Sequence, residues 1–340
     1  MHIPCLVLAC LWTQADVPIV ISKPTNIADA SFRGIAVRSD SEAWVGGSNG
    51  TLMRTTDGGE SWEPIAIPDR EGLDFRDIEL PARHVVVVMA AGPGEKSRVY
   101  RSTDSGVTWK VVLQNTNAKG FFNAIAFWDE TAGILVGDPI AGRVDIYRTS
   151  DGGATWTRLP LANRPRLSEG EYGFAASGTN LTTEGRANAF IATGGSRARL
   201  LVTANRGEFW KSMTTPITSG LKSTGIFSVA FRDHQHGVIV GGDYKQPKVD
   251  NGNVARIGTA ETNFTLVQQR PGIGHKACVR HLTGQKWLAA GRTGVIYTDT
   301  DGHRWSKISN ESFYTFDADE NGGWLAGVDG RVARFKINSK

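Results

Sequence analysis

Cysteine is scarce in this chain, and two of its three cysteines lie close to the N-terminus. The 340 residues include only Cys5, Cys10 and Cys278. If the N-terminal segment is removed, Cys278 remains alone, so the mature chain can form no internal disulfide. Cys278 alternates with its neighbours like a strand residue. We therefore interpret it as a small buried hydrophobic residue rather than a nucleophile.

Long apolar segments, basic runs and cofactor motifs are also missing. After the N-terminus, no segment approaches the ~18 apolar residues that a membrane span needs. The 38 Lys and Arg residues are scattered along the chain and give a net charge of only +4, so no nucleic-acid partner is predicted. No Gly-x-Gly-x-x-Gly motif lies between a strand and a helix, and no Cys-x-x-Cys-His occurs. We expect no cofactor.

Residues 1–15 have the pattern of an export signal cleaved after Ala15, an apolar stretch followed by Thr-Gln-Ala. The alternatives are a first core strand or a start codon placed too late, because no Lys or Arg precedes the apolar stretch. Val7-Leu8-Ala9-Cys10 also resembles a bacterial lipobox, which would make Cys10 a lipid anchor. The mature protein is therefore predicted to be exported, periplasmic or extracellular.

One turn sequence recurs with a fixed spacing. Residues 55–62 read Thr-Thr-Asp-Gly-Gly-Glu-Ser-Trp, and close copies follow at 102–109 and 149–156, so the tryptophans are 47 residues apart. Weaker copies occupy 203–210 and 298–305. Such a period indicates one supersecondary unit copied along the chain. The residues expected to build this structural turn are Asp57, Trp62, Asp104, Trp109, Asp151, Trp156, Trp210 and Trp305.

The rest of each unit predicts strands. Glycine, at 40 residues, fits an all-β chain with many turns. A short apolar strand ending in or near Gly or Ala occurs seven times, at 44–46, 87–90, 135–137, 191–194, 239–241, 288–291 and 325–327. Seven four-stranded antiparallel units without helices predict a seven-bladed β-propeller, with six or eight blades as the error range. We expect one domain over residues 16–340, in which strand 17–21 completes the last blade and closes the ring.

The repeated turn resembles the Asp-box, or BNR repeat, of sialidase-like propellers. The combination of Trp44-Val45-Gly46-Gly47 with the turn at 56–62 is more similar to the Ycf48/Hcf136 photosystem II assembly factors and their non-photosynthetic relatives. Residues 225–233 and 241–247 resemble a bacterial branch of that group whose members often carry only the label "oxidoreductase". The resemblance covers about residues 30–337. It implies a propeller fold and a role as a non-catalytic binding or assembly scaffold.

Candidate binding residues lie on the first strands of several units and in or beside two insertions. Arg33 and Arg76 occupy matching positions on the first strands of units one and two, where they can point into the central channel. An insertion at 164–180 breaks the repeat, and such loops tend to lie on the binding face. A second insertion covers 244–253. The further candidates are Glu169 and Glu171, which are also the catalytic candidates, with Ser177, Asn180, Asp243, Tyr244, Lys245, Lys276 and Arg280.

These candidates also have a purely structural interpretation, as solvated channel-wall residues or ordinary polar loops. His234 and His236 have the spacing of two metal ligands on a strand, but no third ligand lies near them, so no metal site is expected.

We expect a scaffold that binds a protein partner or a glycan at the channel face and acts as a monomer. Whether the protein is an enzyme stays open, with the absence of catalytic motifs favouring no. The alternatives are a sialidase-like hydrolase acting on glycans at the channel mouth and a poorly defined oxidoreductase. Glycoside hydrolysis needs two carboxylates at the site, and the sequence does not establish such a pair.

Overall fold

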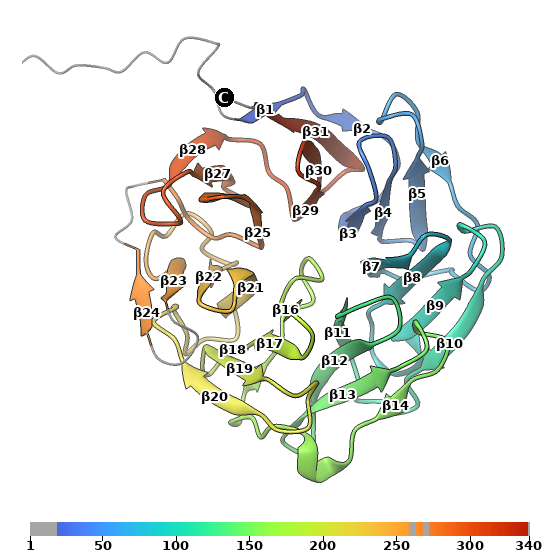
Figure 1. Ribbon diagram of the computed structural model, residues 1–340, viewed down its shortest axis with the longest axis horizontal. Coiled ribbons are helices and arrows are strands. Elements are labelled where there is room, and N and C mark those ends of the chain that lie inside the picture. The colour runs from blue at the N-terminus through green and yellow to red at the C-terminus, as the bar shows by residue number, and fades with distance from the viewer. Residues whose placement is uncertain (1–18, 259–262, 268–271, 339–340) are drawn as a thin grey trace, which may run out of the picture.

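Seven antiparallel sheets surround a central axis (Figure 1) in the computed structural model, which describes residues 19–258, 263–267 and 272–338. Blade 1 contains β3 (Phe32–Val37), β4 (Ala43–Gly47), β5 (Thr51–Thr55) and β6 (Glu63–Pro64). Blade 2 contains β7 (Phe75–Ala82), β8 (Val85–Ala90), β9 (Arg98–Ser102) and β10 (Lys110–Gln114). Blade 3 contains β11 (Phe122–Phe127), β12 (Gly133–Ile140), β13 (Arg143–Thr149) and β14 (Thr157–Arg158).

The later blades follow the same order from the axis outward. Blade 4 contains β16 (Leu181–Glu184), β17 (Asn188–Ala192), β19 (Arg199–Thr203) and β20 (Lys211–Thr214). Blade 5 contains β21 (Thr224–Asp233), β22 (His236–Asp243), β23 (Val254–Gly258) and β24 (Asn263–Leu266), and its sheet is extended by β18 (Gly194–Gly195) and β15 (Glu171–Tyr172). Blade 6 contains β25 (Cys278–Thr283), β26 (Lys286–Gly291), β27 (Gly294–Thr298) and β28 (Ser306–Ser309).

Blade 7 combines the two ends of the described chain. It contains β29 (Thr315–Ala318), β30 (Gly322–Ala326) and β31 (Arg331–Ile337), and its outer edge is β1 (Ile19–Ile21), with β2 (Thr25–Asn26) also paired to β31. Ile19 pairs with Ile337 and Ile21 with Phe335 in antiparallel register. The predicted seven-bladed propeller is confirmed, and each predicted middle strand overlaps the second strand of a blade. The segment predicted to be a signal peptide, Cys10 and the first residues of the predicted closing strand lie outside the described residues.

Helical structure is limited to two short 3-10 turns among the described residues, η1 (Gly94–Lys96) and η2 (Leu161–Asn163). None of the helices in that part of the chain is long and apolar enough to cross a membrane.

The core lies between neighbouring blades. Every residue of β4 is buried, because blades cover both of its faces. Trp44 of blade 1, for example, packs in one cluster with Phe75 and Val88 of blade 2. This explains why the second strands have continuous apolar sequences instead of alternating ones. The inner strands approach so closely that a Cβ on Gly34 would lie 2.9 Å from the backbone nitrogen of Asp77.

The Asp-box turns are closed by their own polar side chains. In blade 1, Ser61 donates its backbone N–H to Asp57 Oδ1 over 3.0 Å and its hydroxyl to Asp57 Oδ2 over 2.5 Å. Thr55 Oγ1 accepts a hydrogen bond from the N–H of Gly59 at 2.9 Å. The side-chain hydrogen bond from Ser61 is the largest cause that lowers the pKa of Asp57 to about 2. Four of the five box tryptophans also donate their indole N–H to a carbonyl within the same turn, namely Trp109, Trp156, Trp210 and Trp305.

An arginine from the third strand of the preceding blade binds each box turn. Arg54 donates to the carbonyl of Ser105 in the next blade over 3.4 Å, and Arg101 donates to that of Gly152 over 2.8 Å. The acceptor is always the residue in the fourth position of the box, and all five acceptors have positive φ. The other three pairs are Arg148 with Arg206, Arg256 with Asp301 and, across the closure of the ring, Arg334 with Gly58.

Candidate functional site

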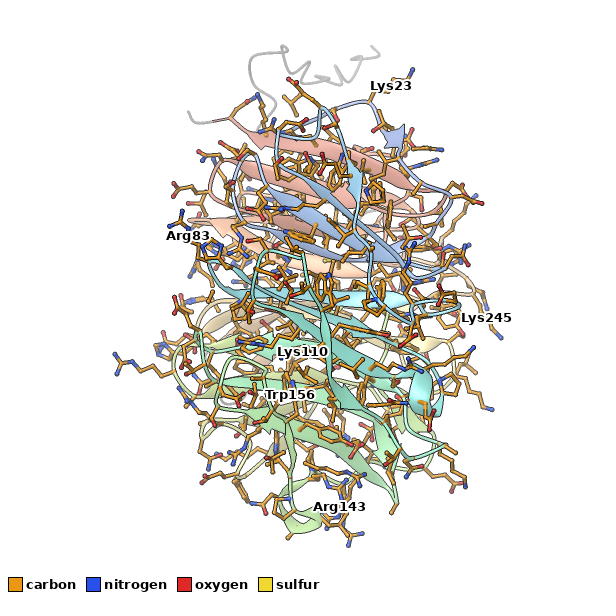
Figure 2. All side chains as sticks on the ribbon, turned by 90° about the vertical axis from the view of Figure 1, so that its right-hand side faces the viewer. Lys23, Arg83, Lys110, Arg143, Trp156 and Lys245 are labelled. Carbon is orange, nitrogen blue, oxygen red and sulfur yellow. The ribbon has the colours of Figure 1, made fainter. Side chains whose placement is uncertain are left out.

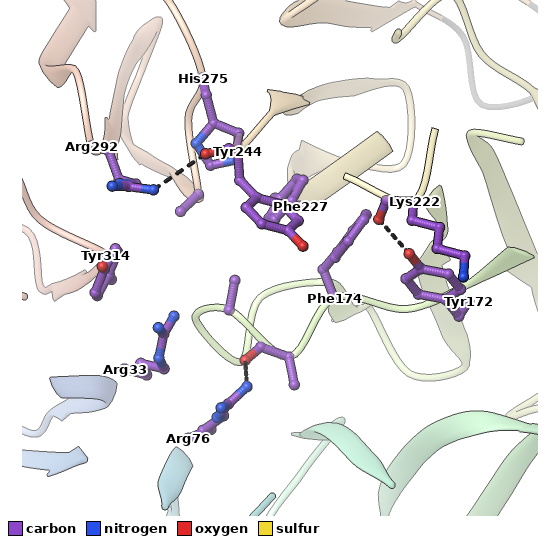
Figure 3. Close-up of a pocket in the computed structure, with 13 residues that line it drawn as sticks. Arg33, Arg76, Tyr172, Phe174, Lys222, Phe227, Tyr244, His275, Arg292 and Tyr314 are labelled. Atoms are coloured by element: carbon purple, nitrogen blue, oxygen red, sulfur yellow. Dashed lines mark hydrogen bonds between the residues drawn. The ribbon is translucent and has the colours of Figure 1, made fainter. Parts of the chain in front are cut away.

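A pocket of about 320 Å³ opens at the end of the central channel where the inner strands begin. We call this side of the disc the pocket face, and the side that carries the box turns the box face. The pocket is lined by residues of several blades and of the insertion that breaks the repeat (Figure 3). The lining residues are Arg33, Arg76, Tyr172, Phe174, Ala175, Ala176, Lys222, Phe227, Tyr244, His275, Ala277, Arg292 and Tyr314.

β-Bulges direct the inner-strand side chains into the pocket. The register of β3 with β4 shifts between Phe32 and Gly34, and that of β7 with β8 shifts between Phe75 and Asp77. The residue left unpaired at each register shift is an arginine of the pocket, Arg33 in β3 and Arg76 in β7. A third shift, between Ile226 and Ser228, holds Phe227 in the same way. Bulges often re-aim side chains next to functional sites, and here they present three residues that a regular strand would direct elsewhere.

Three arginines form the cationic side of the pocket. The Arg33 guanidinium lies 4.4 Å from the centre of the Tyr314 ring and has no hydrogen bond or ion pair to the described residues. Burial, followed by the neighbouring charge of Arg76, lowers the pKa of Arg33. Arg76 is held by Asp74 at 2.8 Å and by the carbonyl of Ala175 at 3.0 Å. Arg292, in the turn between β26 and β27, donates to the carbonyl of Tyr244 over 3.2 Å. The site thus holds more positive charge than its own acids balance.

Aromatic rings form the opposite side. Phe174 and Phe227 are stacked with their centroids 4.0 Å apart, and Tyr244 meets both rings edge-on. His275 packs edge-on against Phe227 at 4.4 Å, and neither of its ring nitrogens has a hydrogen-bond partner in the described part of the chain. Burial and the charge of Lys276 lower the pKa of His275 to about 3, so its imidazole is neutral at pH 7. This wall is suited to an apolar group beside an anion.

The insertion crosses the channel and forms the floor of the pocket. The Ser177 hydroxyl donates to the carbonyl of Ala277 in blade 6 over 2.8 Å, and its own carbonyl accepts from Thr315 of blade 7. Thr179 donates to the Ser228 hydroxyl of blade 5 over 2.7 Å. Figure 1 shows this loop near the axis, leading into β16. The predicted binding residues Ser177 and Asn180 are therefore buried beneath the pocket and do not line it.

Glu171, a predicted binding and catalytic residue, does not line the pocket. Its side chain is fully buried and forms a bidentate ion pair with Arg199, with contacts of 2.6 and 2.8 Å. The Thr193 hydroxyl and the N–H of Ser168 complete its shell. A buried carboxylate with these partners holds β15 to blade 4. Glu169 is exposed and does not line the pocket.

Of the remaining predicted binding residues, only Tyr244 lines the pocket. The Asp243 carboxylate accepts the backbone N–H of Lys245, and the Lys245 side chain is exposed outside the pocket. Lys276 is buried and donates to Thr293 Oγ1 and the carbonyl of Ile273, and desolvation lowers its pKa to about 7. Arg280 lies further along β25, paired with Asp317 at 3.2 Å. The sequence pattern placed these residues near inner-strand ends but did not show which way each points.

Sequence reasoning missed Arg292, Lys222, Phe227 and Tyr314 as a group. One signal was available for two of them. Tyr314 and Phe227 lie two residues before a buried apolar residue on an inner strand, at the register of Arg33 and Arg76. Arg292 and Lys222 are in turns, and no periodicity marks them.

Comparisons with known proteins agree with the resemblance seen in the sequence. The family described as "Photosynthesis system II assembly factor YCF48" matches residues 7–157, which include the three complete box turns. "Photosystem II assembly lipoprotein Ycf48" from Synechococcus sp. (strain CC9605) is 32% identical over 96 residues, which is 28% of this chain and 25% of that protein. The chain thus matches only about a quarter of the length of this curated relative.

Solved structures extend the likeness to the whole fold. The structure titled "YCF48 bound to D1 peptide" superposes with a TM-score of 0.69 at 16% identity and covers 95% of this chain and 98% of that one. Virginiamycin B lyase from Staphylococcus aureus gives a TM-score of 0.67 at 12% identity over 94% of this chain and 100% of that one. Because an assembly factor and a lyase match almost equally well, this likeness shows the fold alone. The resemblance to Ycf48 is confirmed by the family match and the relatives together.

Proposed function

We propose that this Ycf48-like propeller is a non-catalytic scaffold that holds an exposed segment of a protein partner in the pocket of Arg33, Arg76 and Arg292. The observation that carries the proposal is the Arg33 guanidinium, which lies between two further arginines and has no ion pair among the described residues. A carboxylate from the partner would form an ion pair with Arg33 that no described residue provides. Planar guanidinium groups match carboxylates in two-point contacts, which makes them selective as well as attractive.

The aromatic wall narrows the class of partner. An anion alone would need only the arginines, whereas Phe174, Phe227 and Tyr244 offer a surface for an apolar or aromatic side chain. Aromatic and arginine side chains are the residues that most often dominate protein–protein binding energy. A peptide segment that carries both a carboxylate and an apolar side chain fits both walls. The Ycf48 structure with a bound D1 peptide supports a peptide ligand for a propeller of this kind.

We further propose that the scaffold acts in the assembly of a membrane-protein complex after export, anchored by a lipid on Cys10, and works as a monomer. The description of its curated relatives as photosystem II assembly lipoproteins supports this role and this anchor. The resemblance noted in the sequence includes non-photosynthetic relatives, so the partner need not be a photosystem protein.

A glycan hydrolase is less well supported by the pocket. Hydrolysis of a glycosidic bond by the common mechanism needs two carboxylates at the site. The residues that line the pocket in the described part of the chain include no Asp or Glu. Asp74 lies beside these arginines, and it is paired with Arg76.

The proposal is tested by affinity capture from the envelope fraction and by titration with a short synthetic peptide that contains one Asp and one Phe. Arg33→Ala should weaken both interactions about tenfold or more, because it removes one partner of a desolvated ion pair. Arg83, exposed on the opposite face of the disc (Figure 2), provides the matched control Arg83→Ala, which should bind like the wild type. Equal binding by wild type and Arg33→Ala, or cleavage of a glycan by the wild type, would contradict the proposal.

A further inference from the structure

Two loops of the pocket face are hydrogen-bonded to each other, and each contributes a residue to one edge of the pocket. The loop at 215–223 joins β20 to β21, and the loop at 244–253 joins β22 to β23. Thr218 donates its hydroxyl to the carbonyl of Asn251 over 2.5 Å and its N–H to that of Gly252 over 3.1 Å. Tyr244 donates its N–H to the carbonyl of Ser223 over 3.2 Å. We call these two loops the loop rim. Their mutual bonds make the rim a preformed surface.

The loop rim displays apolar side chains to solvent. Leu221 is 58% exposed, Val249 47% and Tyr244 36%. Single exposed hydrophobic residues are ordinary on protein surfaces. Here three of them lie on two joined loops, and Tyr244 also lines the pocket. The apolar surface of the pocket therefore continues outward over the rim.

Each of these apolar residues has a lysine beside it in the sequence. Lys222 follows Leu221, Lys245 follows Tyr244, and Lys248 precedes Val249. None of the three ammonium groups forms an ion pair or hydrogen bond with the described residues. The nearby acids are used by the backbone, Asp243 by the N–H of Lys245 and Asp250 by those of Gly272 and Gly274. The rim thus combines exposed apolar surface with positive charge that no described residue pairs.

We propose that the partner segment continues from the pocket across the loop rim, and that this part of it alternates apolar and acidic side chains. The inference rests on the proposed function, because it extends the same site. Apolar side chains of the segment cover Leu221 and Val249, while its carboxylates lie near Lys222, Lys245 and Lys248. A protein segment fits better than an anionic bilayer, because an extended chain fills the recessed pocket and covers the rim at once. A bilayer would reach only the outermost atoms.

Two synthetic probes test the extension on the full chain. The short probe contains one Asp and one Phe, and the long probe continues it with alternating Leu and Glu. The wild type should bind the long probe about tenfold more tightly than the short one, since each additional 1.4 kcal/mol is a factor of ten. The double variant Leu221→Ser/Val249→Ser should lose this gain and keep the affinity for the short probe. Val107→Ser, in a box turn and 78% exposed, is the matched control and should retain the gain.

The other outcomes separate the extension from the proposed function. If the wild type binds both probes equally, the extension is overturned and the pocket proposal stands. If it binds neither, both proposals fail. If the double variant loses binding to phosphatidylserine vesicles but keeps the gain for the long probe, the rim is a membrane surface and the extension is overturned. Thermal unfolding of each variant shows whether a loss of binding reflects a loss of fold.

Discussion

The box face and the pocket face of the same disc are built on opposite principles. On the box face, one turn recurs with nearly the same residues, and an arginine from the preceding blade reaches the same position of each of five turns. On the pocket face, matching inner-strand positions hold different residues, among them Arg33, Phe227 and Tyr314. The repeated box turns stabilise the ring, whereas the residues that differ between blades give the pocket its charged and aromatic surfaces.

Replacing Glu171 should give the largest loss of stability, because this residue of the pocket-face insertion forms a buried ion pair. Glu171→Ala leaves the mostly buried Arg199 guanidinium without its carboxylate. Loss of one partner of a buried pair costs about 3–5 kcal/mol, so the free energy of unfolding should fall by that order in chemical denaturation. Glu169→Ala, at an exposed neighbour, is the control. A stable Glu171→Ala protein that has lost binding would instead assign Glu171 to the binding site.

Replacing Arg334, which connects blade 7 to blade 1, should give the second-largest loss of stability. Arg334 donates to the carbonyls of Gly58 and Asp40 in blade 1 over 3.2 and 3.0 Å and lies over Trp324. Hydrogen bonds from charged donors are worth about 1.5–3 kcal/mol, and Arg334→Ala should lower the free energy of unfolding within or somewhat below this range. Lys336→Ala, exposed on the same strand, should change it little. Peptide binding should be unchanged in both, because the box face does not contact the pocket.

The smallest expected change in stability comes from the carboxylates of the box turns, and it appears only at acidic pH. Hydrogen bonds from the side chains of Ser61 and Thr108 are the largest causes that lower the pKa values of Asp57 and Asp104 from 3.8 to about 2. A carboxylate whose pKa is lower in the folded state stabilises the fold above its unfolded pKa and ceases to do so as the pH falls through its folded pKa. Thermal stability should therefore decline between about pH 4 and pH 2.

The double variant Asp57→Asn/Asp104→Asn sharpens that experiment. Its acid decline should be shallower than that of the wild type, because two of the titrating groups are gone. An identical decline would show that other carboxylates set the acid stability.

The box turns and second strands were predictable because their determinants are local. A strand such as Ala43–Gly47 is apolar because it is covered on both faces, and Thr, Asp, Gly and Trp close a turn within eight residues. Part of the site was predictable too, since Arg33 and Arg76 occupy matching strand positions. Glu171 shows the limit. Its partner Arg199 lies 28 positions away, and a polar loop sequence does not distinguish a buried ion pair from an exposed acid.

The sequence by itself determined the kind of unit and indicated the number of blades, because a box turn closed by short-range hydrogen bonds recurs along the chain and an apolar strand occurs seven times. Only the tertiary structure decided the pocket. Its residues extend from Arg33 to Tyr314, and they meet because the ring brings the start of each inner strand to one axis. There, bulges direct the side chains inward and the insertion closes the channel beneath them.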